Sequence, residues 1–294
     1  MIFDRRLKTV SSEAIYGERW LRMVYGSRLG RISSSALFGR AWFSVVFGAW
    51  MNTKFSARKI ASFVSRYSID MDEFETPPGG WKSFNEFFSR KLRAGARPFD
   101  ADENTISMPA DGRHSAYPDG ADLSGLVVKG RPFTLAELFG GEDAARPFQG
   151  GSLVVSRLCP TDYHRFHFPL SGIPSETRHI KGGYDSVSPV AIRAGARSLC
   201  GNRRMVTILR TQSFGDVALI EVGAACVGRI VQTYAPGKPV RKCDEKGYFL
   251  FGGSTVITVF QKGRVKLSGD LVEYTASGME TYAKMGGTMG MAQE

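Results

Sequence analysis

After about residue 100, the sequence consists of short β-branched or alternating apolar runs separated by glycine and proline. Such runs are typical of strands that are half or fully buried in a sheet. We predict strands at 152–158, 204–210, 217–222, 228–234, 255–261 and 264–267. Regular alternation of these runs with helical segments is not visible, which disfavours a doubly wound parallel sheet. The sequence therefore predicts a β-rich core over residues 101–294.

Residues 11–68 have a different pattern, in which apolar residues recur at steps of three and four, as in helices. The run 55–67 places Ile60, Phe63 and Val64 on one face, as expected of an amphipathic helix. Proline and glycine at 77–80 interrupt the pattern, and a second helix is predicted at 83–92. The fold class expected is α+β, with N-terminal basic and aromatic helices over residues 1–100 ahead of the β-rich core.

The positive charge of the chain is concentrated near its N-terminus. The whole chain has a net charge of +11, and residues 1–70 contain twelve basic and four acidic residues. A basic segment can bind nucleic acid or anionic lipid. The apolar run 41–51, with Trp42, Phe43 and Trp50, favours a membrane surface and not nucleic acid, although it is far shorter than the ~20 residues of a membrane-spanning helix. Packing of these aromatic residues in a protein core remains the alternative.

The first twenty residues lack the apolar stretch and small-residue cleavage site of a secretory signal, and their acidic residues argue against a transit peptide. We therefore expect a peripheral protein on the cytoplasmic face of the cell membrane. The four cysteines, Cys159, Cys200, Cys226 and Cys243, include no closely spaced pair, so we expect reduced thiols.

Three segments, at 109–112, 162–169 and 251–255, contain residues suited to catalysis. Together they supply Asp111, His164, His167 and Ser254. A serine becomes nucleophilic when a histidine removes its proton and a carboxylate orients that histidine. Taken singly, Asp111 is as easily a turn residue and Ser254 the start of a strand.

The spacing of the two histidines restricts their use. On a strand, His164 and His167 would face opposite sides, so only one could serve Ser254 directly. The pair also lacks the glutamate and the i, i+4 spacing of a helical zinc site, so no metal is expected.

The glycine pair Gly252 and Gly253 suggests that Ser254 could attack its own backbone. Paired glycines allow a positive φ and leave the Gly253 carbonyl unshielded by side chains. Attack by the Ser254 hydroxyl on that carbonyl would convert the amide to an ester. Elimination would then release the upstream chain and leave dehydroalanine, which hydrolyses to a pyruvoyl group. A histidine is a suitable base for these steps.

Several ordered motifs add a resemblance that covers most of the chain. They are FNEFF at 84–88, RKLR at 90–93, RP at 97–98, PADG at 109–112, RLCPTDYHRFH at 157–167, EVGAACVG at 221–228 and DEKGYFLFGGSTVI at 244–257. In these motifs the sequence resembles the phosphatidylserine decarboxylase family. Many members carry leucine where this chain has Gly252. A related branch of the family resembles this chain in having Gly-Gly-Ser-Thr at the corresponding positions, 252–255 here.

The resemblance implies the roles of the site residues. Asp111, His167 and Ser254 would form the self-cleavage triad, and His164 would act in decarboxylation. Cleavage between Gly253 and Ser254 would give a β chain of residues 1–253 and an α chain of residues 254–294, which stay associated. Ser254 would become a covalent pyruvoyl cofactor, so that no external cofactor is needed.

The implied reaction converts phosphatidylserine to phosphatidylethanolamine and CO2 through a Schiff base with the pyruvoyl group. Three alternatives are a decarboxylase of another serine-bearing phospholipid, a Ser/His/Asp hydrolase, and a non-catalytic basic protein that binds lipid or nucleic acid. The sequence leaves a homo-oligomer open.

Overall fold

The computed structural model describes residues 1–12, 46, 48–118, 134–183, 201–223, 229–252 and 254–293. The fold is α+β, as predicted. Within these residues, ten strands form one large sheet, in which β8 (Arg178–Ile180) pairs with β9 beside the main path. The order along that path is β2 (Thr9–Ser11), β1 (Ile2–Asp4), β15 (Glu280–Ala283), β4 (Gly112–Tyr117), β5 (Leu153–Leu158), β13 (Ser254–Phe260), β10 (Asp216–Gly223), β9 (Arg204–Arg210) and β7 (Ile173–Pro174).

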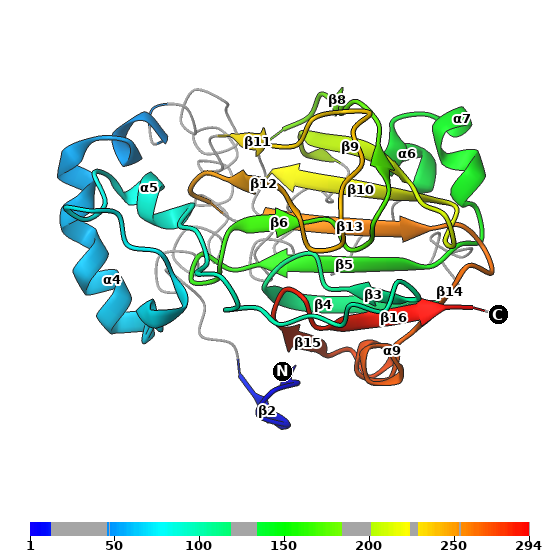
Figure 1. Ribbon diagram of the computed structural model, residues 1–294, viewed down its shortest axis with the longest axis horizontal. Helices are drawn as coiled ribbons and strands as arrows, with labels where there is room; N and C mark the ends of the chain where they lie inside the picture. Colours follow the sequence, from blue (N-terminus) through cyan, green and yellow to red (C-terminus); the bar gives the residue numbers. More distant parts are fainter. Residues whose placement is uncertain are drawn as a thin grey trace, which may run out of the picture.

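Strand β13 lies in the middle of this sheet, antiparallel to β5 on one side and β10 on the other (Figure 1). All seven of its residues are buried, as are all six of β5. Burial on both faces agrees with its sequence, STVITVF, which has no charged residue and is rich in β-branched side chains. The start of β13 is therefore held from both sides by backbone hydrogen bonds.

Two three-stranded sheets complete the β structure. One contains β11 (Ile230–Gln232), β12 (Glu245–Phe249) and β6 (Arg165–His167), and the other contains β14 (Val265–Leu267), β16 (Thr288–Ala292) and β3 (Thr105–Ser107). Short helices α6 (Leu135–Phe139) and α7 (Glu142–Ala145), the 3-10 turn η4 (Arg146–Phe148) and helix α9 (Gly269–Ala276) lie around the large sheet (Figure 1). Two apolar clusters fill the core.

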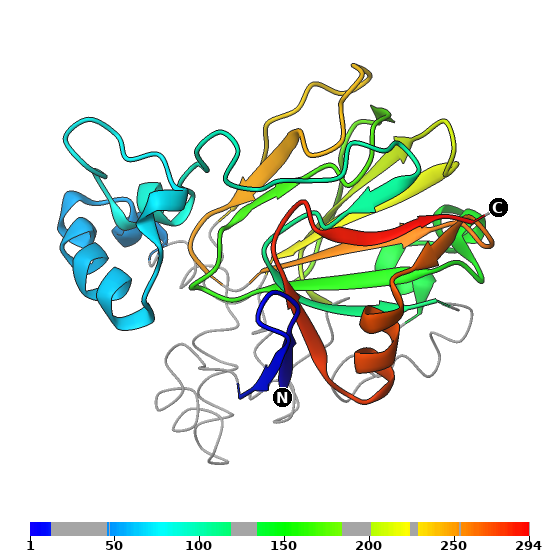
Figure 2. The same ribbon diagram turned by 60° about the horizontal axis from the view of Figure 1, so that its bottom comes forward.

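A separate group of helices lies at one end of the molecule, coloured blue to cyan (Figures 1 and 2). It contains η1 (Lys54–Lys59), α4 (Ile60–Tyr67), η2 (Met71–Glu73) and α5 (Phe84–Phe88). Helix α5 begins after Ser83, whose hydroxyl accepts the N–H of Glu86 as an N-cap. The apolar cluster of this region consists of Met51, Phe63, Phe84, Phe87, Phe88 and Phe251. Phe251 comes from the segment just before β13, so this cluster joins the helices to the sheet.

The predicted strands are confirmed with small shifts of their ends: the run 204–210 is β9, and 255–261 is β13 starting one residue earlier. The prediction of a helix at 83–92 was wrong at its end. Helix α5 stops at Phe88 because Leu92 forms a bridge with Phe74, and the Lys91 carbonyl accepts the N–H of Glu75. The run 55–67 is helical, but its first part is a 3-10 turn.

The N-terminal residues contain strands that the sequence did not predict, since β1 pairs in parallel with β15 near the opposite end of the chain. Residues 13–45 and 47 lie outside the described parts, and so do six of the eleven residues of the run 41–51. Its described residues support both a membrane-facing surface and packing in a core, because Val46 and Trp50 are exposed whereas Met51 is buried. The division of the chain at residue 100 stays a prediction.

Among the described residues, no helix combines the length and apolar character required to cross a bilayer. Cys159 and Cys243 form no disulfide in the described part of the chain, and the other two cysteines lie outside it, so the expectation of reduced thiols stays a prediction.

Candidate active site

The ends of the central strands bring Asp111 and Ser254 to the same end of the large sheet. Ser254 is the first residue of β13 and pairs with Leu158, the last residue of β5, and with Gly223, the last of β10. Asp111 directly precedes β4, the other neighbour of β5. Gly112 is needed here, because a Cβ at this position would lie 2.7 Å from the Arg157 carbonyl oxygen. One strand, β5, thus separates the predicted acid from the predicted nucleophile.

Ser254 is fully buried, and its Oγ forms no hydrogen bond with any described residue. Buried hydroxyl groups are usually hydrogen-bonded, so such a group calls for an explanation. Upstream, Gly252 has a φ of 145°, which residues with a side chain rarely adopt. The expectation that this glycine provides unusual backbone geometry is confirmed, whereas Gly253 lies outside the described residues.

Asp111 is buried and paired with Arg97. The Arg97 guanidinium donates to both carboxylate oxygens, from Nε to Oδ1 at 3.0 Å and from Nη2 to Oδ2 at 2.7 Å. The backbone N–H of Met285 also donates to Oδ1, at 2.8 Å. A bidentate arginine and a backbone donor compensate the burial of the charge. In this arrangement Asp111 is a fixed negative charge and not a surface turn residue.

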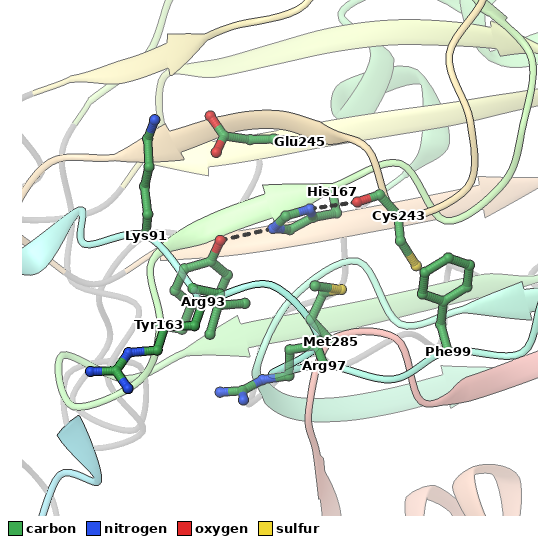
Figure 3. A pocket seen from close by; sticks show the side chains of 11 residues that line it. Lys91, Arg93, Arg97, Phe99, Tyr163, His167, Cys243, Glu245 and Met285 are labelled. Carbon is green, nitrogen blue, oxygen red and sulfur yellow. Dashed lines mark hydrogen bonds between the residues drawn. The ribbon is translucent and has the colours of Figure 1, made fainter. Parts of the chain in front are cut away.

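His167 is the last residue of β6, and both nitrogens of its ring are hydrogen-bonded (Figure 3). Nδ1 lies 2.9 Å from the Cys243 carbonyl oxygen and must donate to it, because a carbonyl only accepts. In the neutral ring Nε2 is then an acceptor, and it receives the Tyr163 hydroxyl at 2.9 Å. Burial lowers the pKa of His167, an effect that the Cys243 carbonyl and the charges of Glu245 and Asp111 oppose. His167 is therefore a neutral base with its lone pair on Nε2.

His164 lies one residue before β6 in an apolar environment. Its ring is fully buried and packs against Phe88 at a tilt of 36°, with 3.8 Å between ring centroids. Nδ1 donates to the Asp162 carbonyl at 3.0 Å, so Nε2 is again the acceptor nitrogen. Burial lowers the pKa of His164 to about 3, opposed by the carbonyls of Asp162 and Gly252. Nε2 forms no hydrogen bond of normal geometry with a described residue, although the Gly252 carbonyl is near enough to affect the pKa.

The described hydrogen bonds do not connect Asp111, His167 and Ser254 into a chain. Asp111 is held by Arg97 and Met285, and His167 is held by Tyr163 and Cys243. The segments of Asp111 and His167 are nevertheless close in the fold, because the backbone N–H of His167 donates to the Pro109 carbonyl at 2.8 Å, two residues before Asp111. A chain Ser254–His167–Asp111 would require His167 to release Tyr163.

A surface pocket of about 250 Å³ opens beside His167 (Figure 3). Its lining includes the buried residues Tyr163, Met285 and Arg97 and the exposed residues Lys91 and Arg93. His167 is thus reached from the pocket, whereas His164 and Ser254 are not among its lining residues.

Sequence reasoning missed three contributors to this site. Tyr163 was quoted only as part of a motif, and Arg97 likewise carried no assigned role. Asn85, in α5, accepts the backbone N–H of Phe251 at 2.8 Å, next to the glycine pair. Each residue stands inside a matching motif, which was the available signal, but its partner could be identified only from the folded chain.

Comparison with known proteins gives a consistent result. The family model described as phosphatidylserine decarboxylase matches residues 84–290. A phosphatidylserine decarboxylase proenzyme of Fusobacterium nucleatum is 42% identical over 287 residues, which cover 98% of this chain and 96% of that protein. The proenzyme of Clostridium beijerinckii is 41% identical over 290 residues, which cover 98% of each chain. The chain therefore belongs to the phosphatidylserine decarboxylase family and is a carboxy-lyase of phospholipid biosynthesis.

Proposed function

We propose that this chain is a precursor that cuts itself between Gly253 and Ser254 and converts Ser254 to a pyruvoyl group, with which it decarboxylates phosphatidylserine to phosphatidylethanolamine. The observation that carries the proposal is the buried Ser254 hydroxyl, which has no hydrogen-bond partner among the described residues and follows Gly252 in its unusual conformation. A hydroxyl kept free of competing hydrogen bonds remains available to attack the preceding carbonyl.

The cleavage balances without an external reactant other than water. The Ser254 Oγ adds to the Gly253 carbonyl carbon, and the C–N bond breaks. The Ser254 nitrogen takes a proton and becomes a free amine, while Oγ is now joined to Gly253 as an ester. Removal of the Ser254 Cα proton then expels the Gly253 carboxylate and leaves dehydroalanine. This tautomerises to an imine, water adds, and ammonia leaves.

His167 is suited to be the base in these steps. Its Nδ1 proton is fixed on the Cys243 carbonyl, its Nε2 lone pair is available once Tyr163 moves, and its lowered pKa keeps it neutral. Asp111, held by Arg97, would stabilise the positive charge that His167 acquires. Asp111, His167 and Ser254 are therefore the proposed cleavage triad.

His164 would act after cleavage. When present at position 254, the pyruvoyl group supplies an electron sink for the negative charge left by departing CO2. His164 lies against Phe88, with the Gly252 carbonyl near its ring. With a proton taken up on Nε2, it would position the substrate carboxylate or transfer that proton to the product carbon.

Mass measurement of the intact purified protein tests the proposal. The native sequence should give two chains, with the smaller one lighter by one ammonia than a fragment starting with serine. Ser254→Ala should give a single chain without decarboxylase activity. An active native protein that consists of one unbroken chain would contradict the proposal.

A phospholipid substrate requires access to a bilayer, and we propose peripheral binding to the cytoplasmic face of an anionic membrane. The exposed aromatic residues around η1 support this proposal. The Lys59 ammonium lies 4.3 Å from the ring centroid of Trp50, and the Arg58 guanidinium carbon lies 5.7 Å from the ring centroid of Phe55. Paired cations and aromatic rings suit the headgroup region.

The affinity of the protein for lipid vesicles tests this proposal. The double variant Trp50→Ala and Phe55→Ala should bind vesicles containing anionic phospholipid about tenfold more weakly. Met291→Ala, which removes an exposed apolar side chain outside both the N-terminal helices and the pocket, is the matched control. Equal binding by all three proteins would refute membrane contact through η1.

A further inference from the structure

Asn85 connects helix α5 to the segment that precedes the proposed cleavage site. The residue is 2% exposed, and its Oδ1 accepts the backbone N–H of Phe251 at 2.8 Å. Its Nδ2 donates to the Asn52 Oδ1 at 3.0 Å and to the Gly48 carbonyl at 3.3 Å. Because the Phe251 N–H can only donate, these contacts fix the orientation of the carboxamide.

The side chain of Phe251 is held by the same helix. Its ring lies 5.2 Å from the ring of Phe84 and 5.0 Å from that of Phe88, both in edge-on contact. Phe88 also packs against the ring of His164. Helix α5 therefore contacts both the chain before the glycine pair and the histidine proposed for decarboxylation.

The glycine pair makes such an anchor important. Gly252 and Gly253 have no side chains that could restrict their conformation, and glycine samples more backbone conformations than other residues. Downstream, pairing with β5 and β10 fixes Ser254. The upstream end of this short segment is fixed at Phe251, where Asn85 binds the backbone itself.

We propose that Asn85 is a positioning residue for self-cleavage, which holds the backbone at Phe251 so that the Gly253 carbonyl stays within reach of the Ser254 hydroxyl. This inference rests on the proposed self-cleavage. Small displacements of reacting groups can slow an intramolecular reaction about a hundredfold. Loss of Asn85 should therefore slow cleavage far more than loss of a comparable hydrogen bond elsewhere in the same helices.

The experiment follows conversion of full-length precursor to two chains in a cell-free translation reaction. Asn85→Ala should cleave about ten- to a hundredfold more slowly than the native sequence. Asn85→Asp keeps an oxygen acceptor for the Phe251 N–H and replaces the Nδ2 donor group by a second carboxylate oxygen, so it should cleave at least about fivefold faster than Asn85→Ala. This partial rescue is not expected of a merely structural role, because a buried aspartate destabilises the helices at least as much as alanine.

Ser56→Ala is the matched control. The Ser56 hydroxyl is buried in the same helical group, accepts the backbone N–H of Phe84 at 2.9 Å and is near the carbonyls of Met51 and Thr53, to which it can donate. This variant should lower the melting temperature but cleave within about twofold of the native rate. Native-like cleavage of Asn85→Ala, or equal slowing of Ser56→Ala and Asn85→Ala, would overturn the inference.

Ser254→Ala separates this inference from the proposal on which it rests. If the native precursor cleaves and Ser254→Ala does not, self-cleavage stands whatever the Asn85 variants do. If the native chain stays uncut, both the proposed self-cleavage and the proposed role of Asn85 are refuted.

Discussion

His164 and His167 are three residues apart and share one tautomer, yet their surroundings differ. Each donates its Nδ1 proton to a backbone carbonyl, of Asp162 and Cys243 respectively, and thereby leaves Nε2 as the acceptor. The Nε2 of His167 meets a tyrosine hydroxyl beside a surface pocket. His164 is sealed against Phe88, close to Gly252. One short segment of chain, β6 and the residue before it, therefore places one imidazole beside a surface pocket and another in a closed apolar environment.

The largest effect is expected from His167→Ala. If this histidine is the base for cleavage, its loss should slow the appearance of two chains at least about a thousandfold, within the range that general base catalysis contributes. Decarboxylation should be lost too, because no pyruvoyl group forms. Gel electrophoresis of the purified protein and release of labelled CO2 measure both effects. A variant that still cleaves normally would remove the distinction between the two histidines.

His164→Ala should separate the two steps. The precursor should cleave, while release of CO2 falls about a hundredfold, because a proton donor or positioning group for turnover is lost. Intact mass and CO2 release, measured on the same sample, give the two readouts.

His114 provides a matched control for the His164 variant. It is also fully buried, with a pKa lowered to about 4 by burial, and its ring bonds to Ser156 and the Ala283 carbonyl. His114→Gln should retain cleavage and decarboxylation. Loss of both steps in His164→Ala, or of neither, would contradict the proposed division.

The smallest effect is expected in the pH dependence of self-cleavage. Burial lowers the pKa of His167 below its ordinary value of 6.5, so the ring stays neutral as the pH falls to that value. The cleavage rate of the native precursor should therefore change by less than about twofold between pH 7.5 and 6.5 and decrease only at lower pH. His164, with a pKa of about 3, does not titrate in this range. A rate already halved at or above pH 6.5 would show that His167 is not the neutral base described.

Local sequence patterns predicted the strands of the core well. Strand β9 was correct at both ends, and β13 within one residue, because alternating or continuously apolar runs reflect burial directly. Strand β1 was missed because it is three residues long and its partner β15 is almost the full chain length away. Helix α5 was predicted too long, since its end depends on a bridge between Phe74 and Leu92.

The candidate site shows the same limit. Motifs identified Asp111, both histidines and Ser254 as residue types, but not the hydrogen bonds that hold them. The pair of Asn85 and Phe251 spans 166 positions. Such contacts depend on how whole elements pack, and a single sequence contains no direct record of that packing.

The position of β13 between β5 and β10 has a consequence for the two products of the proposed cut. Both neighbours belong to the longer product, while β14, β15 and β16 of the shorter one also pair within the described sheets. Severing the bond before residue 254 and losing its nitrogen would leave the pairings of residues 255–260 and of β14, β15 and β16 in place. The subunits would then need neither an encounter step nor regulated synthesis of separate partners, and their one-to-one stoichiometry would follow from their common origin.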